Sequence, residues 1–215
     1  GLAGTEAALG IVPAGSGNGL ARHLGIPVNL RGSLQLLNKG RIATIDTATI
    51  NGEFFVNLAG IGFDAMVAKK FAVAGTRGFS TYFRIIAGSY PKYKPKQYIL
   101  EIDGKTYKRQ ALLISFANSS QFGNNASIDP TASVSDGLID VCIVGKIPLW
   151  KTFLFAPLLM LRQFHRTRYI EIIKAREVVI KRKKGKNVHL DGDPKEMGKT
   201  LVVKINPLSL KVITP

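Results

Sequence analysis

The feature that most constrains the fold is the series of short apolar runs and turn pairs that begins at residue 42. Alternating or continuous apolar runs occur at 42–49, 53–59, 97–102, 106–117, 138–144, 169–173, 176–182, 187–190, 200–205 and 209–213. Several are separated by Asn51-Gly52, Asp103-Gly104, Asp136-Gly137 and Lys184-Gly185-Lys186. Asn-Gly and Asp-Gly pairs tolerate positive φ and favour hairpins. So many short strands with so little helix between them predict a mainly β chain that contains an antiparallel β-sandwich.

The remaining segments carry helix and loop signals. Two helical stretches interrupt the strands, one at 64–89 and one at 148–164, where Pro157 is expected to kink or break the helix. The first 43 residues predict a helix end at 5–8, a buried strand at 9–12, a helical start at 20–24 and a helix at 33–38. The N-terminal part therefore has an α/β character that the rest of the chain lacks.

Charge and composition limit the partners. The chain has 30 Lys+Arg against 14 Asp+Glu, a formal net charge of +16, and 46% hydrophobic residues. This apolar content excludes a disordered chain, and the charge indicates an anionic partner, which is a nucleic acid, a phosphorylated substrate or a membrane surface. Cys142 is the one cysteine, so no internal disulfide can form. No apolar run approaches the roughly 20 residues of a transmembrane helix, and no signal peptide is expected.

A glycine-rich loop lies in the sequence GIVPAGSGNGLARHLG at 10–25. A strand, a glycine loop and a helix in this order can turn backbone N–H groups toward a nucleotide phosphate. The spacing matches neither the Walker A motif nor G-x-G-x-x-G. An ordinary tight turn between strand and helix explains the loop equally well when it is taken alone.

Carboxylates are scarce, so the isolated ones are candidates for chemistry. Asp136 and Asp191 each precede a glycine and can be explained as turn formers. Asp193 lies beyond such a pair, where the turn does not require it, and could bind a metal or accept a proton. The Asp64 carboxylate stands in GIGFDA without an assigned role.

Two basic regions and one apolar segment indicate the type of surface. Residues 162–186 and 69–96 are rich in Lys and Arg, the second group beside several aromatic residues. This pattern fits single-stranded nucleic acid and an anionic membrane interface equally well. The segment 149–164 is apolar all round; packing in the core is expected for most of it, while Trp150, Phe153 and Phe155 could face acyl chains.

Four stretches together resemble one family, the bacterial diacylglycerol-kinase-family lipid kinases, which are relatives of sphingosine and ceramide kinases. They are GIVPAGSGNGLARHLGIP (10–27), IDTATINGEFFVNLAGIGFDAMVAKK (45–70), FANSSQFGNNASIDPTASVSDGLIDVCIV (116–144) and VHLDGDP (188–194). The resemblance implies a two-domain enzyme with its active site between an α/β nucleotide domain and a β-sandwich. It implies that 1–43 and 207–215 belong to the nucleotide domain and 44–206 to the sandwich. The family's Gly-Gly-Asp-Gly-Thr loop is absent, so the natural chain is expected to begin earlier.

The resemblance also implies roles for residues at the nucleotide and the acceptor. Ser16 stands where the family has a Thr or Ser that touches the phosphates, and Gly15, Gly17 and Asn18 shape that loop. Asp193 matches the proposed general base, although many relatives have Glu there.

Magnesium ligands follow from the same resemblance. Asp46 stands in the acidic network around the active site, and Asp136 matches a structural ligand assisted by the backbone carbonyls of Ser133 and Leu138. Oxygen-only ligation suits this hard cation. Gly19 stands where many bacterial members have Asp, so the loop looks more like the sphingosine-kinase version.

The expected function is therefore Mg²⁺-dependent transfer of the γ-phosphoryl of ATP to a lipid hydroxyl, on diacylglycerol or a sphingoid- or ceramide-type lipid. The expected location is cytoplasmic, with peripheral binding to the anionic inner membrane face, and a homodimer is left open. The alternatives are a basic β-sandwich that binds nucleic acid and a kinase for a soluble acceptor, as in NAD kinases. The apolar segment 149–161 favours a lipid, and no nucleic acid is expected.

Overall fold

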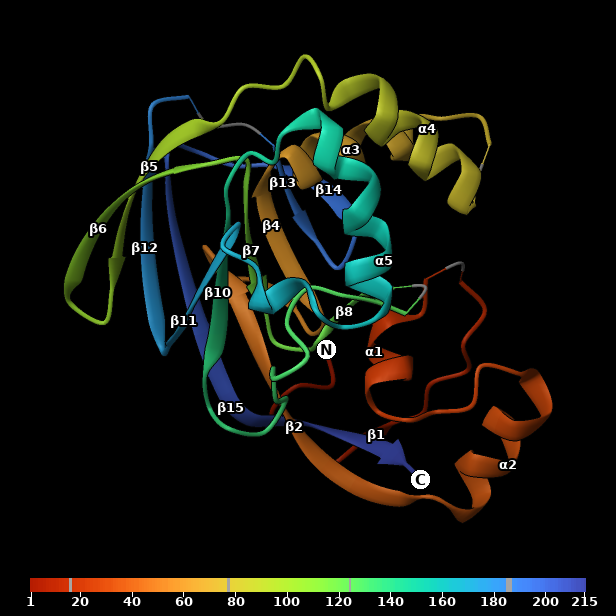
Figure 1. The fold of residues 1–215 in the computed structure, drawn as a ribbon. Helices are drawn as coiled ribbons and strands as arrows, with labels where there is room; N and C mark the ends of the chain where they lie inside the picture. The colour runs from red at the N-terminus through yellow and green to blue at the C-terminus, as the bar shows by residue number, and fades with distance from the viewer. Residues whose placement is uncertain (16, 77, 124, 185–186) are drawn as a thin grey trace.

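The computed structural model describes residues 1–15, 17–76, 78–123, 125–184 and 187–215. Two antiparallel sheets form its centre (Figure 1). The fold is mainly β, as the spacing of apolar runs and turn pairs predicts. Two of the predicted hairpin pairs, Asn51-Gly52 and Asp103-Gly104, have positive φ at both residues, and so has Asp191-Gly192, which is predicted as a turn. The predicted turn Lys184-Gly185-Lys186 includes two residues outside the described ranges. The predicted pair Asp136-Gly137 is different, because only its glycine has positive φ, and it lies in a loop.

The first sheet has seven strands in the order β3-β2-β15-β12-β5-β6, with β1 added in parallel to β15. Its strands are β1 (Ala8–Leu9), β2 (Arg41–Ile50), β3 (Glu53–Phe55), β5 (Lys96–Ile102), β6 (Lys105–Ala111), β12 (Glu177–Arg182) and β15 (Thr200–Thr214). The second sheet has six strands in the order β11-β10-β7-β4-β13-β14. They are β4 (Leu58–Gly62), β7 (Leu113–Ala117), β10 (Ile139–Val144), β11 (Ile170–Ala175), β13 (Asn187–Leu190) and β14 (Asp193–Glu196). A separate hairpin joins β8 (Gln121–Gly123) to β9 (Ala126–Ser127).

The long strands β2 and β15 extend from the sandwich to the N-terminal segment that contains β1. Their pairing shifts register between Asn206 and Leu210, and beyond this irregularity β15 also pairs with β1. The predicted domain boundaries at 43/44 and 206/207 fall within these two strands. The division into two domains remains a prediction, but the last residues do pair with the N-terminal strand.

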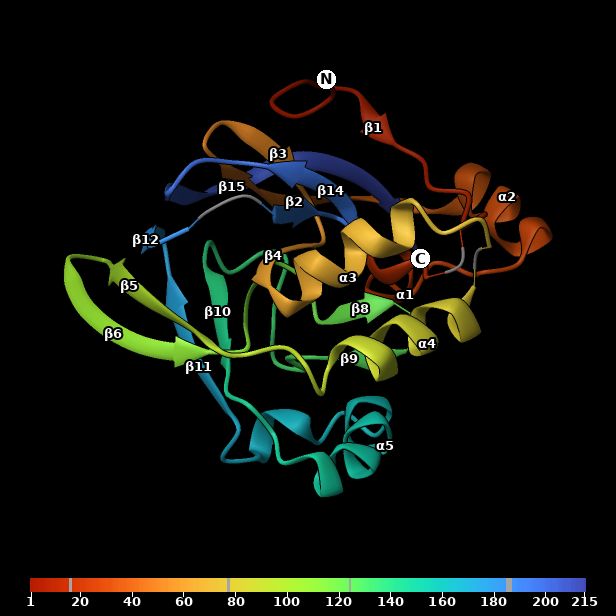
Figure 2. The ribbon, with the colours of Figure 1, turned by 90° about the horizontal axis from the view of Figure 1, so that it is seen from above.

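Helices lie around the sheets. They are α1 (Gly19–His23), α2 (Leu30–Lys39), α3 (Phe63–Ala72), α4 (Phe79–Ser89) and α5 (Phe155–Met160), with 3₁₀ turns η1 (Leu149–Leu154) and η2 (Phe164–Arg166). α3 and α4 cover one end of the second sheet, and α5 lies apart from both sheets (Figure 2). Among the described residues, no helix is both long enough and apolar enough to cross a membrane.

The main core lies between the two sheets and is formed by inward-facing residues of both. Fully buried members include Phe55, Ile61, Leu100, Phe116 and Ile180. A second cluster lies under α3, α4 and α5, and a third joins β1 and α1 to the sheets. Burial of these side chains is the main stabilising term, roughly 25 cal/mol per Å² of apolar surface.

Several predicted elements are wrong in extent. Residues 5–8 do not end a helix, because Ala8 belongs to β1, and that strand stops at Leu9. The run 106–117 is two strands in different sheets, and 200–205 with 209–213 is one strand. The stretch 64–89 forms two helices, and 148–164 forms a 3₁₀ turn followed by α5, with Pro157 inside the first turn of α5. A proline there costs little, since the first N–H groups of a helix have no partner within it.

Candidate functional site

The glycine loop precedes α1 and is closed by its own asparagine. The Gly15 N–H donates to Asn18 Oδ1 at 3.0 Å, and Asn18 Nδ2 donates back to the Gly15 carbonyl at 2.7 Å. Asn18 has the left-handed φ of 50°, and Arg22 Nε donates to the Gly17 carbonyl at 3.2 Å. The predicted phosphate contact Ser16 lies outside the described residues. The described part of the loop is therefore held in one shape by side chains at its end.

The loop packs directly on the sandwich, and this contact requires glycines. A Cβ on Gly123 would lie 2.9 Å from Gly17 Cα. A Cβ on Gly19 would lie 2.8 Å from Asn57 Nδ2 and 2.9 Å from the Gln121 carbonyl oxygen. Since real Cβ atoms keep more distance than this, a side chain at position 19 would require the neighbouring groups or the backbone to shift.

Helix α1 is joined to the sandwich through a histidine. His23 Nδ1 lies 2.9 Å from Ser120 Oγ and accepts the Ser120 N–H at 3.2 Å. Burial lowers the pKa of His23, and repulsion from Arg162 lowers it further. The neutral ring is the form that can accept the amide proton, so the pKa shift and the geometry agree.

The β13–β14 hairpin is fixed at its turn by Asp191. Its carboxylate accepts the N–H groups of Val56 and Asn57 at 2.9 Å each and of Leu58 at 3.0 Å. Asn57 in turn donates Nδ2 to the Gln121 carbonyl at 3.1 Å, next to Gly19. Asn57 therefore links the start of α1 to the turn of the hairpin. Asp191 was predicted only as a turn former, and nothing in its spacing indicates that it binds three amides.

Asp193 begins β14, directly after this turn, and is exposed. The other charged side chains of β14 are paired: Lys195 with Glu53 at 2.9 Å and Glu196 with Lys69 at 2.7 Å. Across the ranges that the structure describes, no hydrogen bond or ion pair engages the Asp193 carboxylate. This carboxylate is consequently available to a bound molecule.

A buried polar cluster lies beneath the hairpin, where α3 packs on β13 and β14 (Figure 1). Asp64 Oδ2 accepts the Ser115 hydroxyl at 3.1 Å and lies 3.2 Å from His189 Nε2. Gly60 permits this approach, because a Cβ there would meet Asp64 Oδ2. Burial, followed by the Asp64 charge, raises the pKa of Tyr82 to about 12. The sequence singles out Asp64 but contains no signal that brings these groups together.

The carboxylate of Asp46, which is predicted to stand in a magnesium network, accepts backbone amides in this structure. It is fully buried; Oδ1 accepts the Leu208 N–H at 2.7 Å and Oδ2 the Gly137 N–H at 2.8 Å. Its own N–H donates to the Val134 carbonyl at 2.6 Å, and its carbonyl accepts Asn118 Nδ2 at 2.9 Å. The geometry gives Asp46 a structural role, as the joint between the 134–137 loop and the irregular part of β15.

Asp136, predicted as a structural magnesium ligand, is bonded to one backbone amide and one lysine. Asp136 Oδ1 accepts the Leu138 N–H at 3.1 Å, and Oδ2 accepts Lys174 Nζ at 2.9 Å. Lys174 also lies 3.1 Å from Asp140 Oδ1. Ser133 and Leu138 are the other predicted ligands, through their backbone carbonyls, and the Ser133 hydroxyl accepts the Ser135 N–H at 3.3 Å. In this structure the Asp136 carboxylate is thus paired with an ammonium group, and its role as a magnesium ligand stays a prediction.

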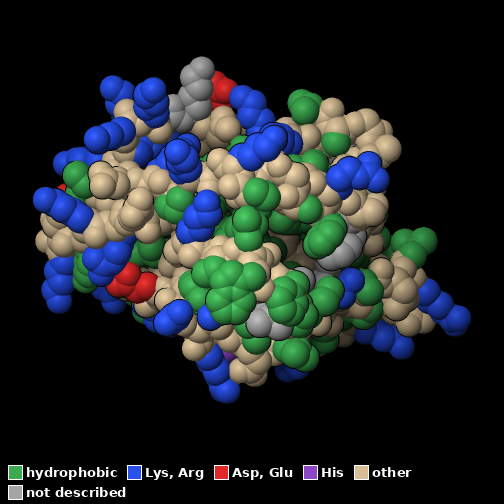
Figure 3. All heavy atoms as spheres, turned by 45° about the horizontal axis from the view of Figure 1, so that its top comes forward, with side chains coloured by type: hydrophobic (Ala, Val, Ile, Leu, Met, Phe, Trp, Pro, Cys, Tyr) green, Lys and Arg blue, Asp and Glu red, His purple; other side chains and the backbone are tan. Residues whose placement is uncertain are grey.

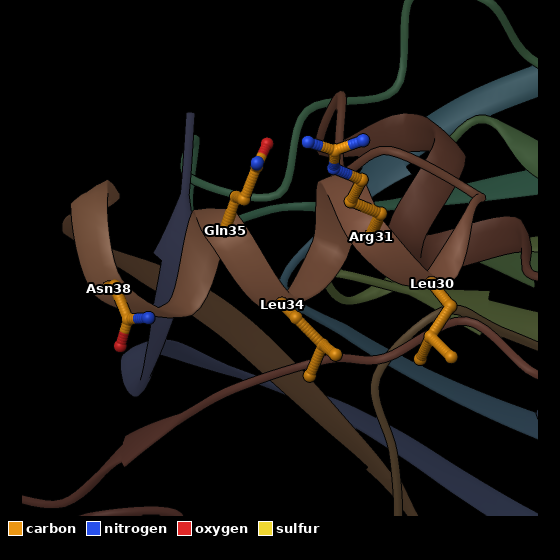
Figure 4. Close-up of a pocket in the computed structure, with 5 residues that line it drawn as sticks. All are labelled: Leu30, Arg31, Leu34, Gln35 and Asn38. Carbon is orange, nitrogen blue, oxygen red and sulfur yellow. The ribbon is translucent and has the colours of Figure 1, made fainter.

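Two surface depressions formed by described residues lie elsewhere. One of about 470 Å³ follows α2 and is lined by Leu30, Arg31, Leu34, Gln35 and Asn38. Figure 4 shows the two leucines on one side of this helix and Arg31 with Gln35 on the other. The second, of about 480 Å³, lies near Leu24 and Thr214. Neither contains Asp193 or the glycine loop, so these depressions do not define the candidate site.

Comparison with known proteins gives two family matches. The "YegS C-terminal NAD kinase beta sandwich-like domain" matches residues 57–214, and the "Diacylglycerol kinase catalytic domain" matches residues 1–50. A diacylglycerol kinase of Mycobacterium tuberculosis is 29% identical over 200 residues, which cover 89% of this chain and 64% of that protein. A probable YegS-like lipid kinase of Pseudomonas aeruginosa is 28% identical over 218 residues, 98% of this chain and 69% of that protein.

The fold has a solved counterpart. The crystal structure of a putative diacylglycerol kinase from Bacillus anthracis superposes with a TM-score of 0.78 over 97% of this chain and 70% of that chain, at 23% identity. At this identity the likeness shows the fold alone. The chain spans less than two thirds of the length of the mycobacterial relative.

Proposed function

We propose that this chain, which belongs to the family of YegS and bacterial diacylglycerol kinases, is part of an ATP-dependent kinase that phosphorylates a lipid hydroxyl. The observation that carries the proposal is the exposed carboxylate of Asp193, which no described residue engages. It lies next to a hairpin turn that is bonded to Asn57, and Asn57 in turn packs against Gly19 at the end of the glycine loop. The two family matches, over 1–50 and 57–214, meet at this place in the fold. Relatives named diacylglycerol kinase and lipid kinase favour a lipid acceptor.

The residues around the site would work mainly by positioning, because a phosphoryl transfer leaves little covalent chemistry to the protein. The Asn18 side chain holds the loop whose backbone N–H groups would face the phosphates. Mg²⁺ that accompanies ATP would neutralise the charge of the transferred group. Asp191 fixes the turn that carries Asp193, and Asp193 would orient the lipid hydroxyl and accept its proton.

The acceptor is proposed at the level of a chemical class, a membrane lipid with a free hydroxyl. Diacylglycerol is the first candidate because it is named in the relatives, and a sphingoid or ceramide lipid is the second because of Gly19. The proposal places the protein at the anionic face of a membrane as a peripheral protein. The net charge of +16 supports this location.

The test is phosphate transfer from labelled ATP by the full-length natural protein to diacylglycerol, sphingosine, ceramide, phosphatidylglycerol and NAD, each presented separately. Labelled lipid product is expected, and a label on NAD alone would refute the lipid assignment. Asp193→Asn should lower kcat by about 10³-fold or more, within the range of acid–base catalysis. Asp103→Asn, which changes another exposed aspartate at a hairpin turn, is the matched control and should leave kcat unchanged. Turnover of Asp193→Asn close to the control would remove Asp193 from the mechanism.

A further inference from the structure

An apolar tip projects from the molecule around η1 and α5. Its side chains share high exposure: Leu149 55%, Trp150 69%, Phe153 71%, Met160 47% and Leu161 68%. Figure 2 shows this segment standing away from both sheets. Single exposed apolar residues are ordinary, but five within thirteen positions of one projecting segment mark an interaction surface.

The core does not need the exposed side chains. The segment is anchored by Phe155, which is buried with its ring 5.3 Å from Phe164 and 5.5 Å from Tyr169. The prediction that Phe155 could face acyl chains is therefore wrong. Tyr90, at the end of α4, holds the base of the segment by bonding the Ile147 carbonyl at 2.7 Å and the Ile147 N–H at 2.9 Å. The inner side of the segment is therefore packed against the protein, and Trp, Phe and Leu side chains are exposed on its outer side.

Positive charge surrounds the apolar tip. The segment 141–170, which contains it, has no Asp or Glu, and neither has 65–100, which forms most of α3 and α4. Lys151 Nζ lies 4.6 Å from the centre of the Trp150 ring, and Arg162, Arg166 and Arg168 follow α5 as exposed residues. In Figure 3 hydrophobic side chains gather in a patch that Lys and Arg border, with few acidic groups on that face.

We propose that the apolar tip inserts into the surface of an anionic lipid bilayer. Aromatic rings with one polar edge suit the interface of a bilayer, and the surrounding cations are attracted to anionic headgroups. A second copy of this chain is a poor occupant, because it would bring the same cations against the same face. The inference deepens the proposed function and rests on it for the lipid nature of the partner: the tip would hold the enzyme at the layer in which its acceptor resides.

The single tryptophan of the chain makes the test direct, since intrinsic tryptophan fluorescence reports on Trp150 alone. The full chain is mixed with vesicles of phosphatidylcholine, with or without phosphatidylglycerol. A blue shift of the emission and quenching by brominated acyl chains are expected on the anionic vesicles only. The double variant Phe153→Ser, Leu161→Ser should sediment with these vesicles about tenfold less, as loss of two inserted apolar side chains predicts.

The matched control is Leu30→Ser, Leu34→Ser, which changes two exposed leucines of α2 and should leave sedimentation unchanged. Circular dichroism of both double variants should equal that of the parent chain, because all four side chains are exposed. Sedimentation of the tip variant equal to that of the control, or vesicle binding without a change in Trp150 emission, would overturn the insertion. Equal binding to neutral vesicles would overturn the role of charge, and preference for an oligonucleotide over anionic vesicles would replace the membrane as partner.

Two measurements distinguish a wrong insertion hypothesis from a wrong kinase assignment. The tip variant of the full-length protein should phosphorylate lipid in detergent micelles at the parent rate and on vesicles more slowly. Absence of lipid phosphorylation in micelles by the parent would refute the kinase proposal even if Trp150 inserts.

Discussion

Asp46→Asn tests whether Asp46 joins two segments of the fold, and its effect can be worked from the contacts. The carboxylate is fully buried and accepts one backbone N–H at each oxygen, from Leu208 and Gly137. Asparagine keeps one acceptor and turns its NH₂ group toward the other N–H. Loss of one charge-assisted hydrogen bond and burial of an unpaired N–H should lower the free energy of unfolding by about 3 kcal/mol. Most domains have only about 5–15 kcal/mol in total.

The assay is urea denaturation of the chain followed by far-UV circular dichroism, without ATP or magnesium. Glu101→Gln is the control, since Glu101 is exposed on β5 and no hydrogen bond or ion pair engages its side chain in the described part of the chain. The control should stay within about 0.5 kcal/mol of the parent, as is usual at the surface. If the Asp46→Asn variant is as stable as the control in the absence of metal, the structural role of Asp46 is refuted. The predicted magnesium network would then be the remaining explanation for this residue.

Three further predictions concern the elements that position the site. Arg182→Lys should lower the free energy of unfolding by about 3 kcal/mol in urea denaturation, because one buried guanidinium donates to three backbone carbonyls beside the β13–β14 hairpin. The control Lys181→Met changes an exposed side chain of the same strand and should not lower it. Because the pKa of His23 is lowered, its contribution to the stability of the folded chain is complete at and above about pH 6.5 and should fade as the pH falls. The NMR resonance of the Ser120 amide should therefore shift in acid, and a resonance that does not change with pH would contradict this prediction. Gly19→Ala should lower the free energy of unfolding by about 1–3 kcal/mol, because the added methyl would lie 2.9 Å from a backbone carbonyl oxygen. The midpoint of thermal unfolding should fall accordingly, and an unchanged midpoint would contradict the tight contact.

The sequence predicts the class of fold well where the signal is local. Hairpin pairs such as Asn51-Gly52 and Asp103-Gly104 form the expected turns, because positive φ is a property of the residues themselves. The run 106–117 shows where local signals stop. It contains two strands that belong to different sheets, since Leu112 turns between them and bonds the Val144 carbonyl. An apolar run is the same whichever sheet it joins, so only the packing decides.

The candidate site is predicted in part for a similar reason. The glycine loop and Asp193 follow from a resemblance in linear motifs, and their roles stay predictions. The carboxylates of Asp46 and Asp191 bind backbone amides that are far away in the sequence. The spacing of residues around each aspartate therefore cannot predict these partners. The same holds for Lys174, whose ammonium lies beside Asp136 only because β11 pairs with β10.

The central claim, that the glycine loop and Asp193 serve one site, is tested most directly by a crystal structure of the full-length natural protein with a non-hydrolysable ATP analogue, Mg²⁺ and a short-chain acceptor lipid. We expect the nucleotide phosphates at the glycine loop and the acceptor hydroxyl within about 3 Å of the Asp193 carboxylate, the reach of a general base. A nucleotide bound elsewhere, or an acceptor hydroxyl out of reach of Asp193, would contradict it.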